Sequence, residues 1–136
     1  MEEMLEKYAA AVLAKDVDAF VGLYADDVRT FDLWNEWSYD GKDAFRAMVT
    51  EWFGSLGDEE EVVVEWDDLR SQTGEAVAAG SAFLTYRAVS TEGTELRSMN
   101  NRLTWILRQN ADGTWKIAHE HTSAPAGEGG KVQLRR

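Results

Sequence analysis

The chain has 136 residues, which is enough for one domain with a sizeable buried core. It contains no cysteine, and this excludes disulfides, thiolate metal sites and a cysteine nucleophile. A formal net charge of -11 disfavours binding to nucleic acid and to anionic membrane surfaces. The first ten residues, MEEMLEKYAA, are acidic where a signal peptide is basic, and no later stretch is apolar for long enough to span a membrane. We therefore expect a soluble, cytoplasmic protein.

Three helices are expected in the N-terminal part of the chain. Residues 2–14 have apolar side chains at the i, i+3, i+4, i+7 spacing of one buried face, which points Tyr8 inward. Asp16 is a good N-cap for a second helix, whose periodicity continues to Tyr24 before Ala25-Asp26-Asp27 ends it. The third helix is expected between Asp40 and Gly54.

The rest of the pattern is typical of strands. A short strand is expected over 28–33, with Asp32 near its end, followed by an aromatic-rich loop over 34–39. Turn residues then separate four long antiparallel strands, at about 61–70, 75–90, 94–109 and 114–123. Helices followed by strands predict an α+β domain over 1–125, and the Gly-rich segment 126–136 is expected to be a flexible C-terminal tail or an added strand at a partner.

Three helices cover only one face of such a long sheet. We expect that face to hold the helices and a pocket, and the outer face to pack against a second subunit in a homodimer. The six tryptophans supply unusually many bulky rings for an apolar pocket. Trp34, Trp37 and Trp52 are predicted to form its wall and lid, although each is also compatible with an ordinary core position.

Strand alternation predicts further pocket residues. In the strand over 94–109, Asn101 and Trp105 share a face with apolar side chains, and we assign that face to the pocket. His119 and His121 are placed together on one face of the last strand, at the pocket floor. Asn101 is then either paired with one of these histidines or available to a ligand carbonyl. A His-x-His pair without a clear third ligand favours hydrogen bonding over a metal site.

Several sequence segments resemble a known family. The run YAAAVLAKDVDAFVGLYADDVRTFD, the later YDGKDAF and the final WKIAHEHTS are similar to the SnoaL-like, ketosteroid-isomerase-like branch of the nuclear-transport-factor superfamily. The resemblance covers the chain from about Glu3 to Pro125. It implies a cone-shaped single domain with three N-terminal helices packed on a strongly curved, mostly antiparallel sheet that encloses a pocket.

The resemblance also implies site residues. Asp32 matches the general-base aspartate of ketosteroid isomerases, and Tyr8 matches their oxyanion-binding tyrosine. The family's protonated acid on a late strand corresponds to a position near Trp105, whose indole N–H would be a partial substitute. His119 is expected to assist as a second acid or base. Taken singly, Tyr8 is also typical of a core tyrosine, and Asp32 of a residue that orders the following loop.

These features favour a small cofactor-independent isomerase, lyase or cyclase. It would act by proton abstraction on an apolar carbonyl compound, such as a polyketide or steroid-like molecule. The alternative is a non-catalytic domain of the same fold that binds a small ligand or oligomerises. Epoxide hydrolysis by an Asp-Arg-Asp relay is a third possibility, but Arg102 is predicted to face away from the pocket.

Overall fold

The computed structural model describes the whole chain, residues 1–136. Three helices lie in its N-terminal part: α1 (Glu2–Ala14), α2 (Val17–Val21) and α3 (Lys42–Ser55). Alone among these helices, α2 begins at a side-chain cap, because Asp16 accepts a hydrogen bond from the Ala19 N–H. No helix is both long and apolar enough to cross a membrane.

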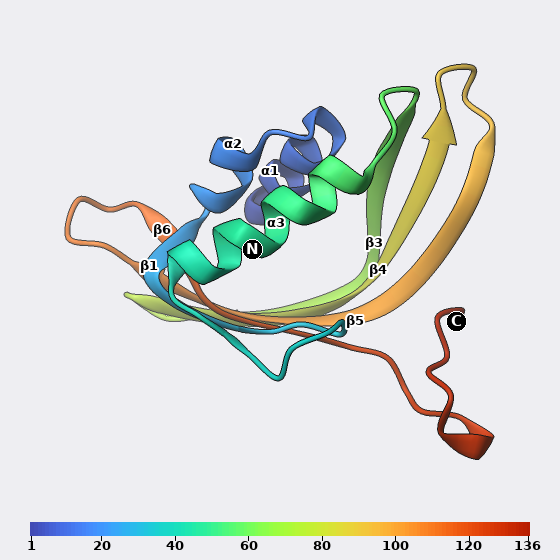
Figure 1. The fold of residues 1–136 in the computed structure, drawn as a ribbon. Helices are drawn as coiled ribbons and strands as arrows, with labels where there is room; N and C mark the ends of the chain where they lie inside the picture. Colours follow the sequence, from blue (N-terminus) through green and yellow to red (C-terminus); the bar gives the residue numbers. More distant parts are fainter.

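Six strands form one curved sheet, which the helices cover on its concave side (Figure 1). The strands are β1 (Tyr24–Phe31), β2 (Tyr39–Asp40), β3 (Glu60–Thr73), β4 (Val77–Ser90), β5 (Glu95–Gln109) and β6 (Trp115–Ser123). Their order in the sheet is β2-β1-β6-β5-β4-β3, and only the β1–β6 pair is parallel. The predicted α+β class, with three helices on a curved and mostly antiparallel sheet, is confirmed.

The second helix is shorter than predicted. It ends at Val21, and β1 already begins at Tyr24, whereas the apolar periodicity predicted helix through Tyr24. The cause is pairing with β6, because the Ile117 N–H donates to the Leu23 carbonyl oxygen at 2.8 Å and Tyr24 pairs with Ile117. Tyr24 is fully buried in this strand, and the inward face of a helix would bury it too, so burial alone did not distinguish helix from strand.

A cluster of apolar and aromatic side chains fills the space between the helices and the concave face of the sheet. Phe20 of α2 lies at its centre, with its ring centroid 4.9 Å from that of Tyr8 and 6.0 Å from that of Phe45. These contacts fix α1, α2 and α3 on the sheet because each ring buries a large apolar area.

A β-bulge in β6 reverses which side chains face the helices. Ile106 pairs with His119 and Leu107 pairs with Ile117, so Ala118 is an extra residue with no partner in β5. Ile117 points inward and is fully buried. After the bulge, Glu120 is the next inward residue, and the two histidines beside it fall on the outer face.

The last residues fold back along the part of β5 that extends beyond the end of β6. A bridge joins Ala126 to Val132 around a short 3₁₀ turn (Glu128–Gly130), and the Asn100 N–H donates to the Leu134 carbonyl oxygen at 2.7 Å. At the end of the chain, the Arg136 guanidinium contacts Asp67 at 2.8 Å. The expected mobility of this segment remains a prediction.

Candidate functional site

A cavity of about 610 Å³ lies between the helices and the concave face of the sheet. Its lining is mainly apolar and comes from the three helices, the segment after β1, strands β2 to β6 and the C-terminal segment. A few polar side chains interrupt this lining deep in the cavity. Six of them carry the chemistry described below: Tyr8, Asp32, Tyr86, Asn101, Glu120 and Thr122. Apolar walls with a few polar groups are typical of small-molecule sites.

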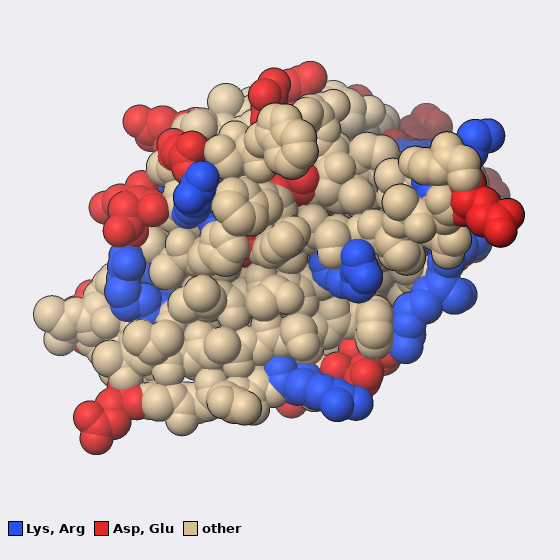
Figure 2. All heavy atoms as spheres, turned by 90° about the horizontal axis from the view of Figure 1, so that it is seen from below, with Lys and Arg blue, Asp and Glu red and all other residues tan.

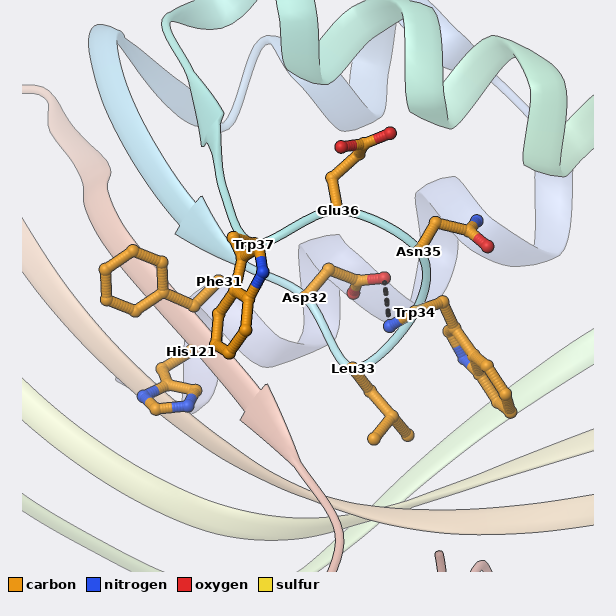
Figure 3. A pocket seen from close by; sticks show the side chains of 8 residues that line it. All are labelled: Phe31, Asp32, Leu33, Trp34, Asn35, Glu36, Trp37 and His121. Carbon is orange, nitrogen blue, oxygen red and sulfur yellow. Dashed lines mark hydrogen bonds between the residues drawn. The ribbon is translucent and has the colours of Figure 1, made fainter.

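Asp32 lies at the cavity where the chain leaves β1. Its Oδ2 accepts a hydrogen bond from the Trp34 N–H at 3.2 Å, which Figure 3 shows as a dashed line. Its Oδ1 accepts one from the Thr122 hydroxyl at 3.1 Å. Burial raises the pKa of Asp32 above its ordinary value, and the two hydrogen bonds oppose this shift because they stabilise the ionised form. The carboxyl group is therefore held in place and faces the cavity.

Glu120 is a second carboxylic acid at the same cavity, and it was not predicted from the sequence pattern. The side chain is only 3% exposed, and its Oε1 accepts hydrogen bonds from the Tyr24 hydroxyl at 2.6 Å and from Trp105 Nε1 at 2.8 Å. Neither bond uses Oε2. Burial raises the pKa of Glu120 to about 7, and the charge of Asp32 adds to this effect.

Two tyrosine hydroxyls meet at the cavity wall. The oxygens of Tyr8, on α1, and Tyr86, on β4, are 2.7 Å apart, and burial raises the pKa of both groups well above the ordinary value. Both hydroxyls therefore keep their protons at neutral pH. One proton lies between the two oxygens, and the other remains available to a ligand. Tyr86 was not predicted, although strand alternation places it on the same face as the buried Leu84.

Asn101 lines the cavity from β5, as predicted, and is 7% exposed. Its Oδ1 is buried and has no hydrogen-bond partner. The predicted pairing with His119 or His121 does not occur, because both histidines lie on the opposite face of the sheet.

The placement of His119 and His121 at the pocket floor was wrong. The ring Nδ1 of His119 donates to the Arg29 carbonyl oxygen at 2.7 Å, and both imidazoles pack edge-on against Phe31 outside the sheet. Simple alternation from the buried Ile117 predicts both histidines inside, but the bulge at Ala118 shifts the phase by one residue. The structure contains no group of three or more His, Cys, Asp or Glu side chains that could hold a metal ion.

The predicted tryptophan wall is only partly assembled. Trp52 and Trp34 line the cavity, although Trp34 is 46% exposed. Trp37 is 97% exposed and lines an adjoining hollow of about 480 Å³, which shares Asp32, Trp34 and Asn35 with the cavity. Figure 3 shows Trp37 near Phe31 and His121, which line the same hollow. Trp105 is fully buried beneath the cavity, where it donates to Glu120 and does not contact the cavity itself.

Comparison with solved structures identifies the class of this fold. An NTF2-like protein of unknown function from Pseudomonas putida superposes with a TM-score of 0.82 at 26% identity, covering 98% of this chain and 90% of that protein. A Caulobacter vibrioides protein with a cystatin-like fold gives 0.71 at 16% identity, covering 90% and 84%. Aln2 from a Streptomyces species gives 0.76 at 12% identity, covering 90% and 85%. The domain thus has an NTF2-like, cystatin-like fold.

The sequence assigns the chain more narrowly within this class. The model of the SnoaL-like domain matches residues 1–127, which is nearly the whole chain. The chain therefore belongs to the SnoaL-like domain family. No curated protein sequence matches it.

Proposed function

We propose that this protein is a small enzyme that transfers protons on a largely apolar carbonyl compound, as an isomerase, lyase or cyclase. The observation that carries this proposal is the position of two carboxyl groups, Asp32 and Glu120, at one mainly apolar cavity. Paired acids with different surroundings can divide the roles of base and acid between them.

Asp32 is the proposed base. Its carboxylate is the less buried of the two, and its pKa is raised from the ordinary value, which improves its match to proton abstraction near neutral pH. A proton on a carbon next to a carbonyl group would pass to one of its oxygens. The hydrogen bonds from Trp34 N–H and Thr122 hold that carboxylate in a fixed orientation.

Glu120 is the proposed proton donor. With a pKa of about 7, a large share of Glu120 is protonated at neutral pH. Its Oε1 is occupied by Tyr24 and Trp105, so the proton belongs on Oε2. Ionised Asp32 favours the protonated form of Glu120, since two negative charges at one cavity repel each other.

The tyrosine pair is the proposed stabiliser of the negative charge that develops on the carbonyl oxygen. Tyr8 and Tyr86 share one hydrogen bond and keep one hydroxyl proton for the ligand. A neutral, fixed donor in an apolar cavity stabilises an enolate oxygen strongly because little reorganisation is needed.

A ligand screen followed by an assay of turnover tests this proposal. Steroids, polyketides and aromatic ketones would be screened by thermal shift, and each hit assayed for turnover with the parent, Asp32→Asn and Glu120→Gln. We expect a hit to be converted by the parent and turnover to fall at least about 100-fold in Asp32→Asn. Hits that bind without turnover would make the protein a ligand-binding domain, and unchanged turnover in Asp32→Asn would remove Asp32 as the base.

We also propose that a second copy of the chain covers the outer face of the sheet. Figure 2 views the molecule from below and shows broad uncharged areas there. Cross-strand pairing puts Ala79, Ile106 and His119 in one row across this face, and Ile106 is 40% exposed. Ile106→Glu should shift a dimer to monomer in sedimentation velocity, while Leu13→Glu on α1 should not. A monomeric parent protein would contradict this proposal.

A further inference from the structure

One end of the cavity presents a free hydrogen-bond donor and a free acceptor. The donor is the second hydroxyl proton of the Tyr8–Tyr86 pair, since a single proton fills the 2.7 Å gap between their oxygens. The acceptor is Asn101 Oδ1, which is buried and has no partner. A buried acceptor without a partner carries a desolvation cost, and a ligand donor would remove that cost.

The orientation of the Asn101 amide follows from its neighbour. Burial raises the pKa of Tyr86, and hydrogen bonding from the Asn101 side chain opposes this rise. A group that lowers the pKa of a hydroxyl donates to its oxygen, so the amide NH₂ faces Tyr86. Oδ1 is then the amide atom left for a ligand, because the amide has only one oxygen.

We infer that the cavity binds molecules with a phenolic or enolic hydroxyl, which donates to Asn101 Oδ1 while its oxygen accepts the free proton of the Tyr8–Tyr86 pair. This inference rests on the proposed function in that it assigns the polar group of the substrate at the same cavity. The substrate class is then a hydroxyaromatic or readily enolised carbonyl compound.

A simple ketone fits this end of the cavity less well. Its oxygen accepts from the tyrosine pair but offers no proton to Asn101, so Oδ1 stays unpaired. The enol of the same compound satisfies both groups. Sites that hydrogen-bond a hydroxyl reject analogues lacking it more strongly than apolar sites reject a missing methylene group.

A matched pair of ligands tests this inference without any assay of turnover. β-Naphthol offers a donor and an acceptor, whereas β-tetralone has a similar two-ring frame and offers only an acceptor. Isothermal titration calorimetry at neutral pH should give at least about tenfold tighter binding of β-naphthol to the parent protein. Asn101→Leu should bring the ratio of the two affinities close to one by weakening the binding of β-naphthol alone.

The stability of Asn101→Leu separates a ligand contact from a structural one. Asn101→Leu removes a buried acceptor that has no partner and also removes the amide contact with Tyr86, and these two effects oppose each other, so the melting temperature of the variant should change little. Thr104→Val, on the outer face of the same strand, is the matched control and should keep the parent's preference for β-naphthol.

Two results would overturn the inference. One is a preference for β-naphthol that persists in Asn101→Leu, and the other is failure of the parent protein to bind β-naphthol more tightly than β-tetralone. Asp32→Asn distinguishes this failure from that of the proposed function. If Asp32→Asn keeps both its turnover and the preference for β-naphthol, the proposed base is wrong and the hydroxyl site stands. If it loses turnover and the parent shows no preference, the hydroxyl site is wrong and the proposed base stands.

Discussion

Trp105 donates its indole N–H to Glu120 Oε1 at 2.8 Å, and the two residues pair directly across β5 and β6. The sequence places Trp105 near the position where the resembling isomerases have a protonated acid. In this protein Glu120 of the neighbouring strand carries a carboxyl group, and the Trp105 indole holds that group in place. The two residues therefore act as one unit, in which changing the tryptophan alters the properties of the acid.

Replacing Trp105 should alter Glu120 in a measurable way. Trp105→Phe removes a donor that stabilises the ionised carboxylate, so the pKa of Glu120 should rise above about 7. NMR titration of labelled glutamate side chains would measure this shift. The smaller ring and the lost hydrogen bond should together reduce the free energy of unfolding by about 2 to 3 kcal/mol. A pKa of Glu120 that is unchanged or lower would contradict the assigned role of the indole.

Glu120 should also make stability depend on pH. Its pKa is raised from 4.5 to about 7 by burial, so the folded protein binds more protons than the unfolded chain between these values. Stability from this group is therefore present below about pH 4.5 and is lost as the pH rises through 7. Glu120→Gln removes this dependence and can keep the bonds from Tyr24 and Trp105, because its amide oxygen also accepts.

The difference between parent and Glu120→Gln gives the size of this effect. Relative to the variant, the parent should lose about 3 kcal/mol of unfolding free energy between pH 4.5 and pH 8. Urea unfolding at several pH values would measure it. Parallel curves for the two proteins over this range would show that Glu120 titrates at its ordinary pKa.

The tyrosine pair should divide its roles unequally. Tyr86→Phe and Tyr8→Phe each break the 2.7 Å contact, and each leaves one hydroxyl at the cavity. With a substrate from the screen, we expect kcat to fall about 100-fold when the hydroxyl that contacts the ligand is removed. We expect Tyr86 to be the hydroxyl that contacts the ligand, because Tyr86 lies next to the Asn101 amide that is proposed to contact the same ligand group. Equal turnover of both variants and the parent would exclude the pair from catalysis.

The C-terminal segment should control exchange of ligands at the cavity. Leu134 lines the cavity. Two residues further on, the Arg136 guanidinium holds the end of this segment on the sheet, because it contacts Asp67 and stacks over Phe83 at 3.7 Å. Arg136→Ala should therefore increase the dissociation rate of a bound ligand in stopped-flow experiments. The exposed neighbour Arg135 supplies the matched control, and equal rates for Arg135→Ala and Arg136→Ala would refute the effect.

The sequence predicted the fold well because regular periodicity reports burial of whole elements. The predicted bounds of α1 agree with the structure, and the four long strands agree to within a few residues at each end. The same periodicity failed at Tyr24, where a buried residue fits either a helix or a strand. It also gave no indication that β1 runs parallel to β6, since pairing of distant strands leaves no local pattern.

The site was harder to predict because one extra residue changes the facing of a strand. Counting from Ile117 in steps of two selects His119 and His121, and the unpaired Ala118 makes Glu120 the inward residue instead. No feature of the sequence WKIAHEHTS marks this bulge. Asp32, Tyr8 and Asn101 lie at the cavity as expected.

Exchange of carbon-bound protons tests the central claim, that Asp32 and Glu120 transfer protons at one cavity. A ketone shown by NMR shift changes to bind in the cavity would be incubated with the protein in D₂O, and loss of its α-proton signals followed. In the presence of the parent protein these protons should exchange faster than in buffer alone. Asp32→Asn should catalyse the exchange at least about 100-fold more slowly than the parent, and Glu120→Gln should also catalyse it more slowly than the parent. Exchange in the parent no faster than in buffer, or undiminished exchange in Asp32→Asn, would contradict the account.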